Sequence, residues 1–263
     1  MKGLARALTP PALWRAGSRL FGGAESAVMF TGVFESFSAV EDQQPWIREP
    51  YLAASRRLLK ECRDRRMPDG SAGSHAVLTL LLNSCAANVP RVLDWAGGTG
   101  LRYWMVRPSL DRPVAWHVVD EPALAALSRD VMGDRDELRF SDTWPEPQTR
   151  FDLALVYSSL QYVDNQAAVL RSIAGYRPRY IVLSRLMATR RAVYVTRQRV
   201  HGFHTPCKVA SLDEVSSTLV ASGYRSILSV EDGIDLSPYF GPDVPETLRV
   251  GFEHLLVFRA ADA

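Results

Sequence analysis

Residues 91–100, RVLDWAGGTG, constrain the fold of this chain more than any other segment, because a short apolar run ends there in an acid and a cluster of glycines. This order is typical of a buried parallel strand followed by a tight turn, and residues 101–106 can begin a helix. Glycines at positions 97, 98 and 100 let the backbone bend sharply and let a ligand approach it closely. The unpaired N–H groups at the start of the helix favour an anionic group such as a carboxylate.

The glycine spacing argues against two common nucleotide sites. A dinucleotide fingerprint, G-x-G-x-x-G, would need a glycine at position 103 or 99, and these positions hold Tyr103 and Thr99. The sequence also contains no phosphate loop of the form G-x-x-x-x-G-K-[ST]. An NAD-linked oxidoreductase is therefore disfavoured, while an ordinary strand–turn–helix in another α/β protein stays open as an alternative.

Three further strand-like segments follow at residues 114–120, 138–142 and 151–159. The first two end in Asp120 and Asp142, and the third ends in small polar residues. In a parallel sheet the carboxyl ends of such strands meet at one crevice. There Asp120 can accept hydrogen bonds from both hydroxyls of a ribose, and Asp142 can meet an adenine amino group. One acid at a strand end is more often a turn or capping residue, but acids at three successive strand ends form a constellation.

The pattern Asp94-x-x-Gly97-Gly98-x-Gly100 resembles motif I of the class I S-adenosylmethionine (SAM) dependent methyltransferases, and the resemblance covers residues 91–260. It implies an α/β fold with a Rossmann-like, seven-stranded, mostly parallel sheet, an antiparallel last strand and helices on both faces. It also implies SAM as the cofactor. The cofactor-binding residues that it implies are Asp94, Ala96, Gly97, Gly98, Gly100, Asp120, Glu121, Asp142, Tyr157 and Ser158.

Two shorter segments carry narrower resemblances. Residues 160–164, LQYVD, look like the segment after strand four of small-molecule O-methyltransferases. Gln161 stands where many of those enzymes carry a catalytic histidine, so base catalysis from this position is not expected. Residues 30–37, taken with 95–100, also resemble a sparsely characterised group of bacterial methyltransferases whose members often occur among surface-polysaccharide genes.

The chain divides into two expected parts. Residues 1–88 have mostly helical patterning and are expected to form a helical N-terminal cap, and residues 89–263 are expected to form the methyltransferase domain. The cap either closes part of the substrate pocket or is a purely structural layer. Residues 224–230 and 254–259 are expected to be the antiparallel pair that closes the sheet.

Composition favours a globular enzyme of 263 residues, with 47% hydrophobic and 23% charged residues. The sequence has neither an apolar stretch long enough to span a bilayer nor a recognisable signal peptide, so a cytoplasmic protein is expected. Three widely spaced cysteines suggest neither a disulfide framework nor a zinc site, and no metal is expected.

The expected partner is a small molecule. Basic residues before position 25 could form a membrane-surface helix, but Pro10-Pro11 interrupts it, and packing against the protein or local disorder is the preferred interpretation. A nucleic-acid partner is not expected at a pI of about 8.5. The sequence leaves open whether the protein forms a homodimer.

Residues 165–212 contain nine basic residues and no acid. Much of this stretch, 185–211, lies between the expected fifth strand and the following helix, on the crevice side where substrate-binding insertions occur. The positive electrostatic field of these basic residues favours an anionic methyl acceptor, for example a carboxylate, a phosphate or a nucleotide-linked group. The alternative is a solvated basic face that pairs with acids elsewhere in the fold.

The expected function is SAM-dependent methyl transfer to a small-molecule or glycan-precursor acceptor, on oxygen rather than nitrogen. The enzyme would hold the acceptor atom in line with the methyl group, and a general base helps if the acceptor is a hydroxyl. His204 and His201 are the candidate bases, with His204 preferred, although each could be structural and a carboxylate or amine acceptor needs no base. The candidate substrate-binding residues are Gln161, Tyr162, Arg185, Tyr194 and Gln198.

One rival interpretation belongs to another class of protein. A SAM- or nucleotide-binding protein that has lost catalysis, and serves as a regulatory or scaffolding subunit, would need the same glycines and acids for binding.

Overall fold

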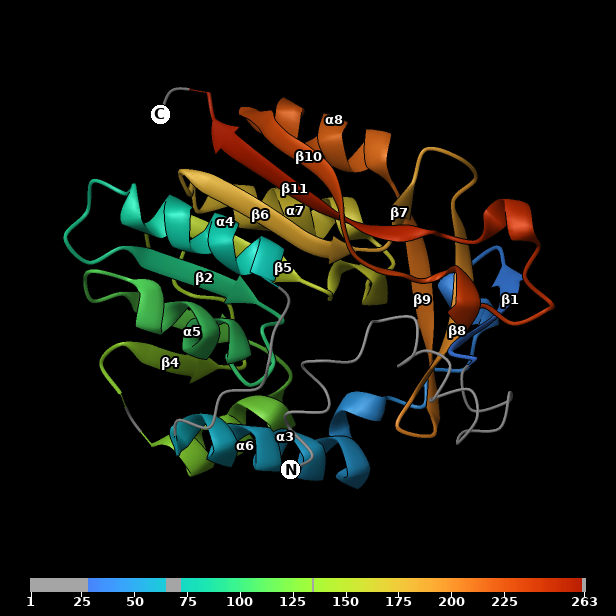
Figure 1. Cartoon of the computed structure of the whole chain (residues 1–263), viewed down its shortest axis with the longest axis horizontal. Helices are drawn as coiled ribbons and strands as arrows, with labels where there is room; N and C mark the ends of the chain where they lie inside the picture. The colour runs from blue at the N-terminus through green and yellow to red at the C-terminus, as the bar shows by residue number, and fades with distance from the viewer. Residues whose placement is uncertain (1–27, 65–71, 134, 262–263) are drawn as a thin grey trace, which may run out of the picture.

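The computed structural model describes residues 28–64, 72–133 and 135–261, and a twisted seven-stranded sheet runs through its centre (Figure 1). The strand order is β10-β11-β6-β5-β2-β3-β4, in which β11 is antiparallel to both of its neighbours and the other pairs are parallel. The strands are β2 (Arg91–Trp95), β3 (Ala115–Val119), β4 (Leu138–Ser141), β5 (Leu153–Tyr157), β6 (Tyr180–Leu186), β10 (Tyr224–Asp235) and β11 (Phe252–Ala260). The predicted seven-stranded, mostly parallel sheet with an antiparallel last strand is confirmed.

Helices cover both faces of this sheet, which explains why its central strands are apolar on both sides. The helices are α3 (Glu49–Arg63), α4 (Ala72–Asn83), α5 (Leu101–Val106), α6 (Pro122–Met132), α7 (Gln166–Gly175) and α8 (Leu212–Ala221). Local signals fix their ends: α6 begins at Pro122, and the Ser211 side chain caps α8 by accepting a hydrogen bond from the Glu214 N–H at 3.1 Å.

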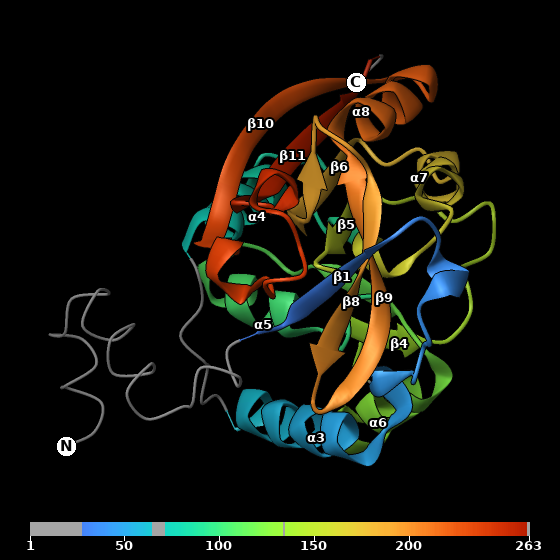
Figure 2. The same ribbon diagram turned by 90° about the vertical axis from the view of Figure 1, so that its right-hand side faces the viewer.

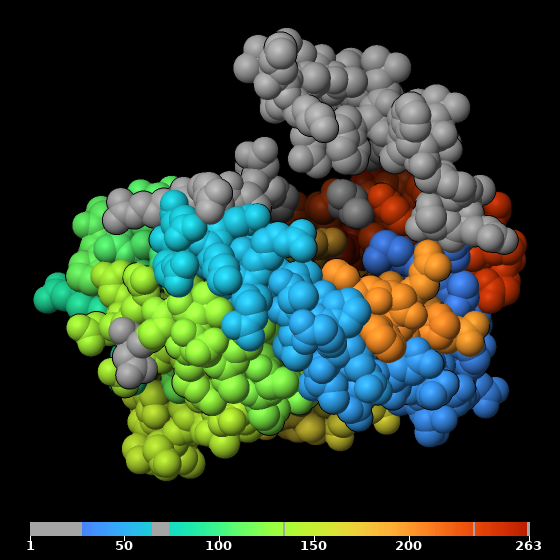
Figure 3. Space-filling view, turned by 90° about the horizontal axis from the view of Figure 1, so that it is seen from below, coloured from blue at the N-terminus to red at the C-terminus, as the bar shows by residue number. Residues whose placement is uncertain are grey.

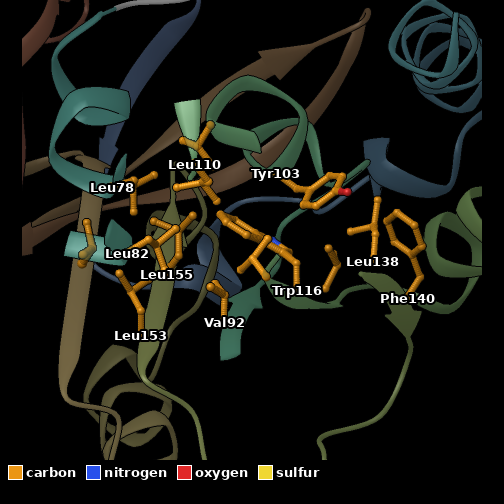
Figure 4. Close-up of a cluster of buried hydrophobic side chains, with 14 of the residues drawn as sticks. Leu78, Leu82, Val92, Tyr103, Leu110, Trp116, Leu138, Phe140, Leu153 and Leu155 are labelled. Atoms are coloured by element: carbon orange, nitrogen blue, oxygen red, sulfur yellow. The ribbon is translucent and has the colours of Figure 1, made fainter. Parts of the chain in front are cut away.

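The two faces of the sheet bury separate hydrophobic clusters. On one face α3, α4, α5 and α6 pack on residues such as Val92, Trp116 and Leu155 (Figure 4). On the other face α7 and α8 pack on residues such as Leu93 and Ala154. Adjacent residues of one strand thus point into opposite cores, as the pleat of a strand requires.

A second, four-stranded sheet lies beside the main one (Figure 2). Its order is β1-β8-β9-β7, with β1 (Phe30–Phe34), β7 (Ala188–Thr189), β8 (Tyr194–Val200) and β9 (Phe203–Ser211). The β8–β9 hairpin is the insertion expected between the fifth strand and its helix. Strand β1 differs from the mostly helical patterning expected for residues 1–88, because its hydrogen-bonding partner β8 lies more than 150 residues away in sequence and cannot be inferred from local pattern.

Short 3-10 helices connect these elements. They are η2 (Phe37–Ala39), η3 (Pro45–Ile47), η4 (Arg107–Ser109), η5 (Leu160–Tyr162), η6 (Ser237–Tyr239) and η7 (Glu246–Leu248). The basic N-terminal segment considered above for membrane contact lies outside the described residues. Within the described ranges no helix is both long and apolar enough to cross a membrane.

Candidate functional site

The turn between β2 and α5 leaves its backbone open to a ligand. Ala96, Gly98 and Gly100 have left-handed φ angles of 50°, 63° and 66°, and the Ala96 N–H donates to the Val119 carbonyl at 2.7 Å. Only open space lies where a Cβ atom on Gly98 would point. The turn is therefore held from behind by β3 while its front stays free of side chains.

Asp94 lies directly beneath this turn and is fully buried. Its Oδ2 atom accepts a hydrogen bond from the Trp116 indole N–H at 2.9 Å, while Oδ1 has no partner within the described part of the chain. Burial raises the pKa of Asp94 to about 7, and the Trp116 hydrogen bond opposes the shift. A Cβ atom on Gly97 would lie 2.5 and 2.6 Å from the two carboxylate oxygens, so this position needs glycine.

Asp120 follows β3 and faces the same turn. Its Oδ2 atom accepts a hydrogen bond from the Gly98 N–H at 2.6 Å, and Oδ1 accepts one from the Glu121 N–H at 2.7 Å. Burial raises the pKa of this carboxyl group, and the two backbone donors counteract the effect. Each carboxylate oxygen keeps a further lone pair with which it can accept a hydrogen bond from a ligand hydroxyl.

A cavity of about 650 Å³ extends along the carboxyl ends of β2, β3 and β5, within the usual range for small-molecule sites. The glycine turn and Asp120 line one part of it, and Asp142 and Trp144 line the part after β4. Helix α3 covers the cavity with Tyr51, Ala54, Ser55 and Leu58. Figure 3 shows this side of the molecule, where α3 lies between α6 and the β8–β9 hairpin.

Four aromatic rings form a continuous part of the cavity lining, which we call the aromatic wall: Trp46, Tyr51, Tyr162 and His201. The ring centroids of Trp46 lie 4.7 Å from Tyr162 and 5.1 Å from Tyr51, and those of Tyr51 and His201 are 5.7 Å apart. Each contact is edge-to-face, a favoured arrangement of aromatic pairs. The four rings come from η3, α3, η5 and the β8–β9 turn, so four separate segments build one surface.

Arg102 brings a positive charge to the same cavity from the first turn of α5. Its guanidinium group stacks on the Tyr157 ring, 3.7 Å from the centroid, and its Nη1 atom lies 2.7 Å from His75 Nε2. No carboxylate in the described ranges lies within 4.0 Å of it. Burial lowers the pKa of Arg102, and Tyr157 and Asp94 oppose the shift. A ligand carboxylate could therefore bind here.

The cavity lining includes ten of the seventeen residues that the sequence suggested for the site. These are Ala96, Gly97, Gly98, Asp120, Glu121, Asp142, Tyr157, Ser158, Tyr162 and His201. Asp94 and Gly100 are buried behind the turn, where they shape it. Residues from the ends of four parallel strands thus meet at one crevice, as their positions in the sheet require.

The other five suggested residues do not line the cavity. Arg185 forms a 2.7 Å ion pair with the buried Glu253, and the Tyr194 hydroxyl donates to the Leu248 carbonyl at 2.7 Å. Gln161 and Gln198 are buried and interact with the Tyr162 hydroxyl from behind. His204, the preferred base, lies on β9, where its backbone exchanges hydrogen bonds with Gln43. In the hairpin, His201 occupies the turn that reaches the cavity, whereas His204 is three residues further along the returning strand.

Sequence reasoning missed Trp46, Tyr51 and Arg102. The apolar spacing of residues 47–59 predicts a helix but does not show which side faces a ligand, because the sheet and the cavity both need apolar cover. Arg102 had a usable signal: a cation in the first helical turn after the glycines points toward the strand ends. The described ranges contain three free, buried cysteines and no group of three potential metal-ligating side chains.

No family model matches this sequence, and no curated protein matches it either. Solved structures do. A chain of the complex between the Haloferax volcanii Trm112 methyltransferase activator and a methyltransferase matches with a TM-score of 0.50 and 17% identity, covering 82% of this chain and 97% of that one. The SAM-bound amino pentose methyltransferase CalS10 of Micromonospora echinaspora has a TM-score of 0.49 and 12% identity over 77% of this chain and 97% of its own.

The fold is that of the class I SAM-dependent methyltransferases. The strand order of the main sheet, its antiparallel seventh strand and the glycine turn after its first strand agree with the likeness at a TM-score of 0.50. At 17% identity this likeness defines the fold, and the activity has to be argued from the site itself.

Proposed function

We propose that this protein is a SAM-dependent methyltransferase that acts on a small molecule. The observation that carries the proposal is the set of groups around the glycine turn: an open backbone, a half-buried acid after the next strand, and a cation that has no carboxylate within 4.0 Å among the described residues, all lining one cavity. Each suits a different part of SAM.

The residues present fit this cofactor. Asp120 has spare lone pairs for the two ribose hydroxyls, and Asp142, which lines the cavity after β4, would accept from the adenine amino group. Arg102 suits the carboxylate of the methionine part, since a guanidinium group binds carboxylates in a fork geometry. The open space in front of Gly98 leaves room for the ligand chain to pass close to the backbone.

The chemistry follows from positioning. When bound, SAM supplies an electrophilic methyl group on a positively charged sulfur. Arg102, Asp120 and Asp142 would hold SAM, which would supply this methyl group to an acceptor oxygen and keep the electron pair of its carbon–sulfur bond. The protein's task is to hold the acceptor in line and in contact with the methyl group. His201 is the base that we propose for a hydroxyl acceptor, because it is the one of the two candidate histidines that lines the cavity.

None of the nine basic residues in 165–212 lines the cavity, so this stretch no longer supports an anionic acceptor. Several of them are engaged elsewhere: Arg185 pairs with Glu253, Arg190 pairs with Asp213, and Lys208 donates to the Asp164 carbonyl at 2.8 Å. This agrees with the alternative of a solvated basic face.

Two measurements test the proposal. Calorimetric titration with SAM and with its demethylated product should show binding, and titration with NADH should not. Incubation with labelled SAM and a cell extract should then transfer label to an acceptor. Binding of SAM without any transfer would favour the rival, a binding protein without catalysis. Absence of binding at millimolar ligand would refute the proposal altogether.

A further inference from the structure

We infer that the acceptor is a planar aromatic compound carrying a hydroxyl group, bound against the aromatic wall. This inference deepens the proposed function and rests on it. It concerns the part of the cavity lined by Trp46, Tyr51, Tyr162 and His201, of which Tyr51 lies near enough to Asp120 for the carboxylate to raise its pKa.

The wall offers mainly ring surface, because the protein itself engages the hydroxyls of both its tyrosines and leaves the Trp46 indole N–H and the His201 imidazole as its polar groups. The Tyr162 hydroxyl interacts with Gln161 and Gln198 behind it, and the Tyr51 hydroxyl interacts with Ser55 of its own helix. A sugar ring would bring several hydroxyls that need partners, and each one left unpaired on burial is costly. An aromatic ring needs mainly apolar contact, and each ring that it meets edge-to-face or offset-stacked adds attraction beyond the area that it buries.

The charges along the cavity point the same way. The acids in its lining, Asp120, Glu121 and Asp142, belong to the part that we assign to the ribose and adenine, and Arg102 stacks on Tyr157 beside the glycine turn. The wall itself contains no carboxylate and no guanidinium group, and the nearby acid Asp120 raises the pKa of Tyr51. An anionic acceptor would therefore find no cationic partner in the wall.

His201 stands where a base for such an acceptor is needed. It lies in the β8–β9 turn with a left-handed φ of 49°, is exposed, and touches the Tyr51 ring edge-to-face. A hydroxyl on a ring bound to the wall would give its proton to the imidazole while the oxygen–methyl bond forms, and the imidazole would release that proton to water. Phenolic hydroxyls ionise near pH 10, so they lose a proton far more easily than sugar hydroxyls.

The test uses the full-length protein saturated with the demethylated product of SAM, which holds the cofactor site without allowing transfer. 2-Naphthol is titrated into this complex by calorimetry, and methyl α-glucopyranoside is titrated in parallel. Wild type is compared with Trp46→Leu and with the matched variant Trp46→Phe, which keeps an aromatic ring. Thermal unfolding confirms that each variant is folded.

We expect 2-naphthol to bind more tightly than the glucoside. Trp46→Leu should lower the affinity for 2-naphthol about 3- to 10-fold, and Trp46→Phe should lower it less. Affinity for the demethylated product should stay within about twofold of wild type, because Trp46 lies outside the groups assigned to it. Equal loss in both variants, an unchanged affinity in Trp46→Leu, or tighter binding of the glucoside would each overturn the inference. If the product fails to bind but naphthol binding still depends on Trp46, the proposed cofactor falls and the aromatic site stands.

Discussion

Replacing Gly97 by alanine should damage both stability and cofactor binding, because of what lies beneath it. The new methyl group would come within 2.5 and 2.6 Å of the Asp94 carboxylate oxygens, well inside van der Waals contact. Asp94 cannot move away freely, since it is fully buried and held by the Trp116 indole at 2.9 Å. The backbone of Gly97 lies outside the left-handed region, so steric overlap rather than a strained φ angle is the cause.

The size of the effect follows from opposing terms. Overpacking a tight core site costs about 1–3 kcal/mol. Replacing glycine by alanine also lowers the entropy of the unfolded chain, which stabilises the folded protein by roughly 0.4–1 kcal/mol. A net loss of about 1–2 kcal/mol remains, which corresponds to a fall in Tm of about 2–8 °C for a chain of this size. Affinity for the demethylated product of SAM should fall at least about tenfold, because the turn must shift to relieve the overlap.

Thermal and urea unfolding measure the loss of stability, and calorimetry measures the loss of affinity for the demethylated product of SAM. Gly175→Ala is the matched control, since a Cβ atom there meets nothing within 4 Å and its φ angle is ordinary. This control should leave stability unchanged or slightly raised. A double-mutant cycle with Asp94→Ala isolates the overlap: the double variant should be more stable than the sum of the single losses by about 0.5 kcal/mol or more. Strict additivity, or a Gly97→Ala protein as stable as wild type, would refute the reasoning.

Three further predictions concern charged groups in the site. Burial raises the pKa of Asp94 from 3.8 to about 7, so the folded protein retains a proton that the unfolded chain releases between these values. The unfolding free energy of wild type relative to Asp94→Asn should therefore fall as pH rises from about 4 to 7, measured by urea unfolding, and a flat difference would contradict the assignment. Arg102→Met should lower the affinity for the demethylated product of SAM about tenfold in calorimetry, and Arg102→Lys should have an intermediate affinity. Equal affinity in wild type and both variants would exclude a carboxylate contact. His201→Ala should lower turnover of a hydroxyl acceptor by about 100-fold at unchanged cofactor affinity, while His204→Ala should leave turnover unchanged. The reverse pattern would restore His204 as the base.

The main sheet could be predicted because its information is local. Each strand of the segment from Arg91 to Tyr157 is a short apolar run that ends in a polar group or glycine, and parallel pairing then brings those ends together. The glycine turn, Asp120 and Asp142 were found this way. Asp94 shows the limit of the same reasoning: its spacing marks it correctly, but its buried position behind the turn appears only when Trp116 from the next strand is packed against it.

The acceptor side could be predicted only in part, for Tyr162 and His201, because the contacts that assemble it are long-range. Trp46 and His201 are separated by 155 positions and meet through Tyr51, and strand β1 pairs with a hairpin more than 150 residues away. No sequence period encodes such contacts. The two histidines illustrate the point, since residue type favours them equally and only the exact end of a hairpin turn decides which one faces the cavity.

Strands β1 and β8 support both sides of the proposed acceptor pocket. The segment that leads into Trp46 follows β1, and the turn that carries His201 follows β8, and among the described residues their small sheet shares no strand with the sheet beneath the glycine turn. On the proposed function, insertions or deletions in either segment would change the choice of acceptor while the cofactor half keeps its architecture. Acceptor specificity and methyl-donor recognition could then evolve at different rates within a single chain.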